Sequence, residues 1–339
     1  MPLNIGLFIV GIVLVAMVLK DVFETVIVPG GSRASLRIAH RLVTVSLPVW
    51  KRVRGRRHGL STGFAPFVLV SCFFVWMALL AIAFGLMAYS VRADFQPPLK
   101  DFGDAVYLAG SSLVTVGLSQ ANPTGLARWA ILGAGFCGLA VMTMAVTYLL
   151  EVQSSITRRD TGIIKLNTSA GEPPSALTLL ERFAALRNQR ALHKVLEESR
   201  DWCATVRQSH TSHPSLIYFR SIGTGAGWPA ALGAALDLGL IAEHMLDDES
   251  LYGPAILLRE EGARMARELA VVIGVSPKAS TTSTTELDQV QQRLAGSGYM
   301  LRSDPNLAAM AEQRSDHMSC VDALAEHLGK PTTVLVRQS

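Results

Sequence analysis

The stretch from Phe64 to Val91 contains no Asp, Glu, Lys or Arg, and this restricts the fold more than any other feature of the sequence. Crossing the hydrocarbon core of a bilayer, about 30 Å thick, takes roughly 20 mostly apolar residues in a helix. Two more stretches meet this requirement, from about Leu3 to Val28 and from Trp129 to Leu150. The sequence therefore predicts an all-α membrane protein with three transmembrane helices.

Charged residues are distributed unevenly along the chain. They make up 17% of the 339 residues, against about 25% in an average soluble chain. They are scarce before Glu151 and dense after it. This contrast predicts a first transmembrane helix at 1–28, a basic loop at 29–62, a second membrane module at 63–155 and a helical domain outside the membrane at 156–339.

The first loop carries the basic residues that set the orientation. No acidic residue lies between Glu24 and Asp94, and the loop holds Arg33, Arg37, Arg41, Lys51, Arg52, Arg54, Arg56 and Arg57. Short loops rich in Lys and Arg stay in the cytoplasm. We therefore expect a multi-pass protein of the cell (inner) membrane, with its N-terminus outside and its C-terminus in the cytoplasm. Because basic residues cluster in this loop, the net charge of +4 indicates membrane topology rather than nucleic-acid binding.

The same loop admits two interpretations. Apolar residues between Leu36 and Trp50 alternate with arginines, as in an amphipathic helix on the inner leaflet that binds anionic lipids. Alternatively, the loop is a basic segment whose only role is to fix the topology. The sequence does not separate these two possibilities.

The segment from Phe102 to Leu126 lies between two predicted spans but is too short and too polar to cross the bilayer. Backbone at membrane depth must satisfy its polar groups within protein or in a water-filled cavity. A short re-entrant helix from Asp104, its expected N-cap, to about Val114 meets that requirement. An extended Thr-Val-Gly stretch is expected to follow, with a positive φ at Gly117 and with carbonyls that replace an ion's hydration shell.

The sequence Ser-Leu-Val-Thr-Val-Gly-Leu at 112–118, followed by a span, resembles the filter of potassium channels. In that family, each of four subunits supplies one pore loop. The resemblance implies a homotetrameric channel for potassium or another monovalent cation, with no cofactor besides the permeant ion. It also implies that the ion filter consists of Thr115, Val116, Gly117, Leu118 and Ser119, with the Thr115 hydroxyl at the inner end.

Two positions depart from the family's pattern. Ser119 stands in place of a second glycine, and Gln120 stands in place of an aspartate. The Gln120 amide can still hydrogen-bond behind the filter, and Ser112 is assigned to the same supporting role. The departures leave potassium-selective and non-selective conduction as alternatives. They also leave a channel-like receptor or scaffold that does not conduct, in which the cytosolic domain binds a ligand or partner.

The third predicted span contains residues with two possible roles each. Gly138 lies near its middle, where related channels have a gating hinge, but small residues also let membrane helices pack closely. Thr143 and Thr147 are one turn apart and can either line an inner cavity or bond back to their own helix. We interpret Gly138 as a candidate hinge, and the packing role remains its alternative.

The C-terminal half has the pattern of soluble amphipathic helices, interrupted by an Ala-Gly-Glu-Pro-Pro break. Helices are predicted at about 175–209, 229–246, 254–273, 286–294 and 306–328. We expect the second of these to be a buried core helix, because a fourth span would place Asp237 in lipid. His210 and His213 are interpreted as structural rather than metal-binding, and Gly223–Gly227 as a turn rather than a nucleotide loop.

The motifs Ala-Gly-Glu-Pro-Pro-Ser-Ala and Ser-His-Thr-Ser-His-Pro-Ser-Leu-Ile-Tyr-Phe-Arg-Ser resemble bacterial membrane proteins of the potassium-channel family that carry a helical C-terminal region. The resemblance covers most of the chain up to about residue 275 and defines neither a role nor a ligand for this region. We expect the region to assemble or gate the channel. The sequence contains no nucleophile elbow, paired catalytic acids or phosphate loop, so we expect no enzymatic activity.

Overall fold

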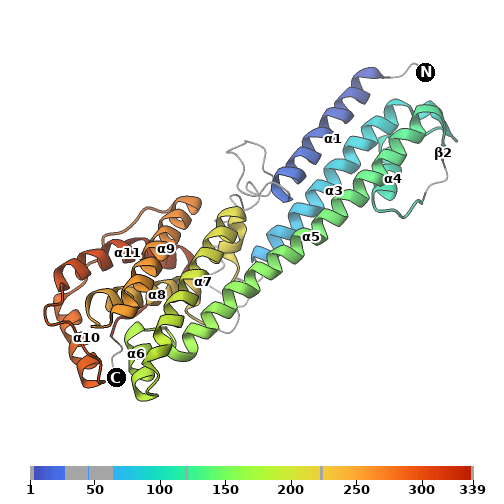
Figure 1. Ribbon diagram of the computed structural model, residues 1–339. Helices are drawn as coiled ribbons and strands as arrows, with labels where there is room; N and C mark the ends of the chain where they lie inside the picture. Colours follow the sequence, from blue (N-terminus) through green and yellow to red (C-terminus); the bar gives the residue numbers. More distant parts are fainter. Residues whose placement is uncertain (1–3, 27–44, 46–63, 119–120, 222–223, 337–339) are drawn as a thin grey trace. The chain divides into compact units, whose positions relative to one another are not determined.

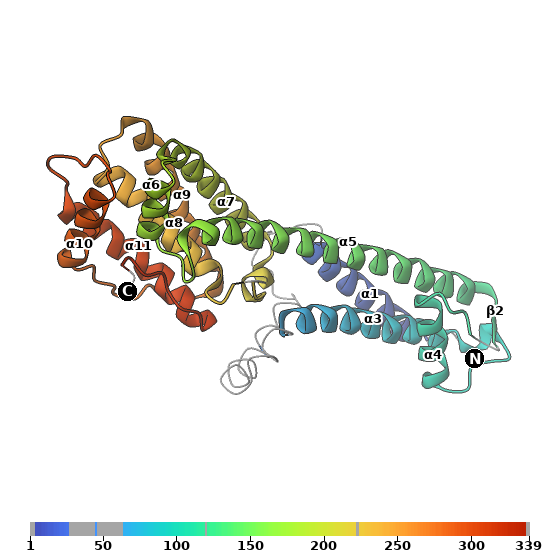
Figure 2. The same cartoon turned by 90° about the horizontal axis from the view of Figure 1, so that it is seen from below.

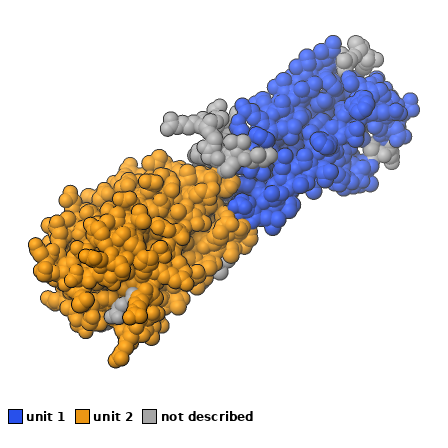
Figure 3. Space-filling model, viewed as in Figure 1, with its two compact units in different colours: residues 1–152 blue, residues 153–339 orange. Residues whose placement is uncertain are grey.

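The computed structural model describes residues 4–26, 45, 64–118, 121–221 and 224–336. It divides the chain into two compact units, residues 1–152 and residues 153–339 (Figure 3). Each unit is helical and has its own apolar core. The proposed amphipathic segment between Leu36 and Trp50 lies outside the described residues, apart from Val45.

Among the described residues, three helices are long and apolar enough to cross a membrane, which confirms the predicted spans. They are α1 (Ile5–Val26), α3 (Phe64–Ser90) and α5 (Gly125–Ala170). Helices α1 and α3 pack side by side in the first unit (Figure 1). Their large apolar side chains face both ways: Val18, Val22, Trp76 and Leu80 are buried, whereas Ile9, Val13, Phe67 and Phe74 remain exposed. An exposed apolar face is expected of a helix whose surroundings are lipid or further protein.

Helix α5 is longer than the sequence suggested. The apolar pattern predicted a span that ends near Leu150, but the helix continues without a break to Ala170 and enters the second unit. Between Glu151 and Ala170 the chain has no proline, and its only glycine is Gly162, so nothing in this polar stretch stops the helix. The change from lipid-compatible to soluble composition therefore occurs within one helix.

The second unit is a helical bundle (Figure 2). After α5 it contains α6 (Ala176–Ala185), the 3-10 turns η2 (Gln189–Ala191) and η3 (Pro214–Tyr218), and α7 (Leu192–Ser212). It continues with α8 (Gly227–His244), α9 (Glu249–Ile273), α10 (Thr284–Gly296) and α11 (Leu307–Leu328). Helix α8 packs against α9 and α11 and is buried along nearly its whole length, which confirms it as a core helix.

One predicted helix is wrong in its extent. The stretch at 175–209 was expected to be continuous, but it forms α6 and α7 with a turn between them. The turn includes Arg187, whose φ of 53° lies in the left-handed region that ends helices. The Pro-Gly break before α6 is present, and Ser175 accepts a hydrogen bond from Thr178 N as the N-cap of that helix.

Candidate functional site

A short helix, α4 (Phe102–Leu113), stands between the second and third candidate spans and packs against α3. It begins two residues earlier than expected, because Asp101 rather than Asp104 is its N-cap. The Asp101 carboxylate accepts a hydrogen bond of 2.9 Å from Asp104 N. Asp104 accepts in turn from Lys100 N at 3.4 Å. The two carboxylates satisfy backbone donors at the positive end of the helix dipole, so they fix the start of α4.

The far end of α4 is held by α5. Gly138 lies directly against the last turn of α4, so close that a Cβ on this residue would overlap the carbonyl of Leu113. The role of Gly138 seen here is therefore close helix packing, one of the two interpretations that its sequence position allowed. A hinge at Gly138 remains a prediction.

The segment Val114–Leu118 leaves α4 and folds back over its end. Both Val116 N and Gly117 N donate hydrogen bonds to Ser111 O, at 2.9 and 3.2 Å. Thr115 N donates to Ser112 O at 3.0 Å, and the Ser111 hydroxyl donates to Leu118 O at 3.3 Å. Ser111 thus supports the segment with both its backbone carbonyl and its side-chain hydroxyl, a role that was not predicted from the sequence. Ser112 contributes its backbone carbonyl.

The sign of the backbone φ angle alternates along this segment. Gly117 has a φ of 69°, as predicted, and Thr115 has a φ of 58°, which was not predicted. Val116, between them, is not in the positive region. A threonine held at positive φ costs about 1 to 3 kcal/mol and is found mainly at functional sites. No sequence signal reveals it, because threonine is ordinarily a residue of extended strands.

The residues before α4 are hydrogen-bonded to the residues after the Val114–Leu118 segment. Strands β1 (Phe95–Gln96) and β2 (Asn122–Pro123) pair antiparallel, with Phe95 opposite Pro123. The backbone N–H and the hydroxyl of Thr124 both donate to Asp94 O, at 2.7 and 2.6 Å. These contacts close the pore loop at its base. Ser119 and Gln120, the two departures from the potassium-channel pattern, lie outside the described residues.

The side chains of the segment are mostly uncovered. Val114, Val116 and Leu118 are 45%, 56% and 60% exposed, a high fraction for large apolar residues. Further along α5, the hydroxyls of Thr143 and Thr147 donate back to Leu139 O and Thr143 O, at 2.9 and 3.1 Å. Both threonines therefore satisfy their hydroxyls within the helix.

The glycine-rich turn at the start of α8 binds an internal anion. The turn leads into α8, and the Glu172 carboxylate accepts hydrogen bonds from it. Glu172 accepts hydrogen bonds from the Thr224 hydroxyl and from Gly225 N and Ala226 N. Although burial acts to raise the pKa of Glu172, these hydrogen bonds and the charge of Lys330 bring it below its ordinary value. The turn is thus a structural contact, as predicted.

Metal-binding clusters are not seen in the described ranges of the chain. His210 lies on α7 and His213 caps its C-terminus, and His317 and Cys320 lie on α11, where both are buried. The structural role of His210 and His213 stays a prediction.

Comparison with known proteins connects the pore loop to one family. Residues 70–154 match the family model described as an ion channel. This range holds most of α3, all of α4, the segment Val114–Leu118 and the first part of α5. No curated protein and no solved structure matches the chain. The pore-loop region is therefore similar to ion channels, and this similarity, together with three apolar helices, indicates a membrane protein of the ion-channel type rather than an enzyme.

Proposed function

We propose that this protein is a cation channel that conducts potassium through a homotetrameric pore, with Thr115–Ser119 as its filter. The observation that carries the proposal is the alternating backbone hand at Thr115, Val116 and Gly117, directly after a short helix between two spans. Such a backbone can present successive carbonyl oxygens toward one side, which is what cation coordination without water requires. The match to an ion-channel family over the same residues supports this reading.

The electrostatics of α4 favour a cation at its C-terminal end. The helix dipole places partial negative charge where Val114 and Thr115 follow the last turn, and the N-terminal end is neutralised by Asp101 and Asp104. Three acidic residues, Asp94, Asp101 and Asp104, lie on the segments that enter the pore loop. On the proposed topology they face the outside and raise the local concentration of cations there.

Oligomerisation follows from the geometry of coordination, and the proposed number of four subunits comes from the resemblance to potassium channels. One pore loop supplies one set of carbonyls and cannot surround an ion, so several copies must meet at an axis. The exposure of Val114, Val116 and Leu118 supports such an arrangement, because these side chains lack cover within their own chain. The proposed partners are therefore three further copies of this protein and the lipid bilayer, with anionic lipids at the basic loop.

The second unit is proposed to assemble or gate the pore from the cytoplasm. Helix α5, which runs from Gly125 to Ala170, has residues in both units and is the proposed route by which the second unit acts on the pore. The orientation proposed here, with the N-terminus outside and the C-terminus in the cytoplasm of a cell's inner membrane, rests on the positive-inside rule.

Recording from the purified protein in planar bilayers under potassium/sodium bi-ionic conditions tests the function. A potassium-selective reversal potential is expected. A reversal potential near zero would instead mean a non-selective pore, consistent with Ser119 and Gln120 in place of the family's residues. Absence of current across a wide range of voltage, pH and calcium would contradict the proposal and favour a non-conducting receptor or scaffold.

A further inference from the structure

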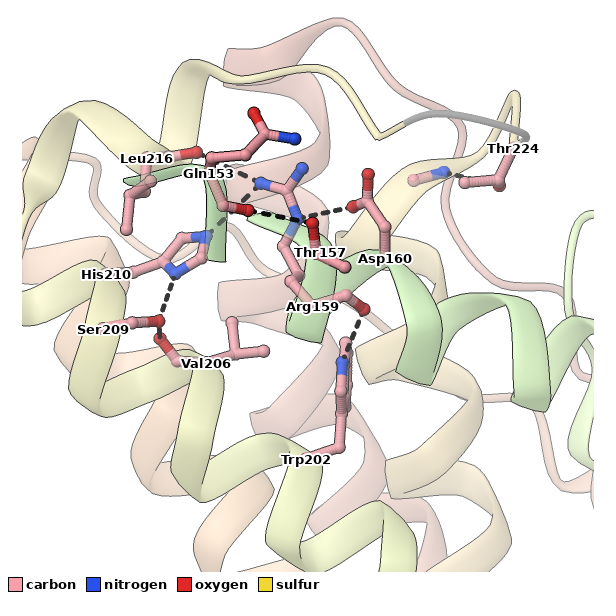
Figure 4. A network of polar contacts seen from close by, with 11 residues as sticks. Gln153, Thr157, Arg159, Asp160, Trp202, Val206, Ser209, His210, Leu216 and Thr224 are labelled. Atoms are coloured by element: carbon pink, nitrogen blue, oxygen red, sulfur yellow. Dashed lines mark hydrogen bonds and ion pairs between the residues drawn. The ribbon is translucent and has the colours of Figure 1, made fainter. Parts of the chain in front are cut away.

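The guanidinium of Arg159 lies fully buried in the second unit, where the C-terminal part of α5 meets α7 and η3 (Figure 4). Its Nε donates to Asp160 Oδ1 at 2.9 Å. Its Nη1 donates to Leu216 O at 3.1 Å and contacts His210 Nε2 at 3.4 Å. A buried cation needs such partners, because leaving it uncompensated is strongly destabilising.

The hydrogen-bond pattern assigns the tautomer of His210. Since Arg159 is always a donor, Nε2 of His210 must offer its lone pair, and the ring proton therefore lies on Nδ1. Nδ1 then donates to the Ser209 hydroxyl at 3.1 Å, and that hydroxyl donates to Val206 O at 3.1 Å. The chain of donors runs in one direction, from Arg159 to the backbone of α7.

A second contact holds the same turn of α5. The indole Nε1 of Trp202, on α7, donates to Arg159 O at 3.0 Å. A Cβ on Gly162 would overlap this indole, so the close approach requires glycine at a position in the middle of a helix. Helix α7 therefore contacts Arg159 of α5 in two ways: Trp202 binds its backbone carbonyl, and His210 binds its guanidinium.

We propose that the contact between Arg159 and His210 is a proton-sensitive clamp, which holds the C-terminal part of α5 against α7 and releases it when His210 takes up a proton. The clamp does not depend on the proposed function. The proposed function only adds a consequence, because in a channel α5 is the helix that follows the filter. The clamp itself is a property of the second unit.

The geometry makes proton uptake and the contact mutually exclusive. A proton can bind His210 only at Nε2, the atom that accepts from Arg159, and the imidazolium then presents an N–H and a positive charge to a guanidinium. The charged groups that act on His210 are Arg159 on α5 and His213 at the end of its own helix. Asp160 is engaged by Arg159 Nε, α8 presents the neutral ring of Trp228, and η3 presents the Leu216 carbonyl.

The environment sets the range in which the clamp responds. Burial, and next the charge of Arg159, hold the pKa of His210 well below its ordinary value of 6.5, against a smaller opposing effect of the Val206 carbonyl. The clamp is therefore closed at neutral pH, and acidification below this ordinary value opens it. Histidine is the side chain suited to such a response.

Hydrogen–deuterium exchange on the full-length protein in nanodiscs tests the clamp without requiring conduction. After correction for the intrinsic pH dependence of exchange, peptides that cover residues 155–163 are expected to lose protection as the pH falls from neutral to well below 6.5, the ordinary pKa of histidine. In His210→Gln, an amide oxygen can accept from Arg159 but cannot be protonated, so protection is expected to persist. His193→Gln, which changes an exposed histidine on the same helix α7, should behave like the wild type.

Parallel loss of protection in wild type and His210→Gln, or no loss in either, would overturn the proposal. If His210→Gln does not fold, Arg159→Met provides the second test, because removal of the guanidinium abolishes the repulsion and with it the pH response of this turn. Bilayer recording with varied cytoplasmic pH then separates the two proposals. A pH-dependent clamp without current refutes the channel alone, whereas current with a pH-independent clamp refutes the clamp alone.

Discussion

The indole Nε1 of Trp76 donates a 2.7 Å hydrogen bond to Asp21 Oδ2, and this bond joins α3 to α1 within the first unit. Both residues are almost fully buried. Acidic residues within a membrane span are rare and generally face protein or a water-filled cavity. Tryptophan supplies a single directed donor together with a large apolar surface, so this pair fixes the rotation of α1 about its axis as well as its position.

Replacement of Trp76 by phenylalanine is expected to destabilise the protein by about 1 to 2 kcal/mol, because it removes both the interhelical hydrogen bond and part of the buried indole. The comparison with a variant of Asp21 separates the bond from the packing. Thermal unfolding of the detergent-solubilised protein measures the effect. Asp21→Asn retains an acceptor oxygen and should cost less, and an equal loss in both variants would contradict the role assigned to the indole.

Substitution of Gly138 can distinguish its two possible roles, close helix packing and a gating hinge. In Gly138→Ala, the new Cβ would overlap Leu113 O, which is backbone and cannot rotate away. Overpacking of this kind costs about 1 to 3 kcal/mol, so the melting temperature should fall. Gly135→Ala is the matched control, because its Cβ would stand 3.5 Å from Ser112 O, an ordinary contact. A wild-type melting temperature for Gly138→Ala, with altered open probability, would favour the hinge instead.

Much of the membrane half followed from the sequence, because bilayer thickness and charge placement are strong constraints on a helix. The three spans and the helix before the filter segment were predicted on those grounds, and Gly117 was predicted to adopt a positive φ. The N-cap was placed at Asp104 instead of Asp101, since both carboxylates precede the same apolar pattern. The left-handed conformation of Thr115 depends on hydrogen bonds to Ser111 and Ser112, which pattern reasoning does not contain.

The second unit was harder to predict, for reasons that its polar contacts make clear. The helix continues past Leu150 because no residue stops it, whereas hydropathy registers only the end of the apolar stretch. The contact between Arg159 and His210 joins residues on two helices, and a basic residue after a span reads as an ordinary topology signal. His210 was expected to be structural rather than metal-binding, and the sequence gives no indication of its partner.

The ion pair between Asp237 and Arg314 predicts a large loss of stability when it is broken. Asp237 is fully buried on α8, and its carboxylate accepts from Arg314 Nε at 2.7 Å and from Nη2 at 3.2 Å. Asp237→Asn should therefore cost about 3 to 5 kcal/mol in the free energy of unfolding, because a buried guanidinium loses its countercharge. Chemical denaturation of the full-length protein measures this loss.

The surface pair of Lys165 and Glu198, 3.6 Å apart with side chains 64% and 47% exposed, supplies the control for that experiment. Glu198→Gln should cost less than about 1 kcal/mol. A comparable effect of the two substitutions would mean that Asp237 acts through packing rather than through its charge.

The stability of the second unit should depend on pH through His317. Burial, and next the charge of Arg259, lower the pKa of this histidine to about 4. Between pH 6.5 and pH 4 the unfolded chain binds a proton that the folded chain does not, so stability is complete above pH 6.5 and falls as the pH decreases. The shift corresponds to a loss of about 3 kcal/mol. Unfolding curves of His317→Gln should show a smaller decrease over this range, and an unchanged slope would contradict the assignment.

Gly117 allows conduction to be tested separately from folding. An alanine at this position meets no atom within 4 Å, so its only penalty is a φ of 69°, worth about 1 to 2 kcal/mol for a residue with a Cβ. Gly274, which ends α9, has the same φ of 69° and equally open surroundings. Gly117→Ala and Gly274→Ala should therefore lower the melting temperature similarly. Only Gly117→Ala is expected to change single-channel conductance and selectivity, since its strained backbone belongs to the proposed filter. Equal conductance in the two variants would exclude a filter at Thr115–Ser119.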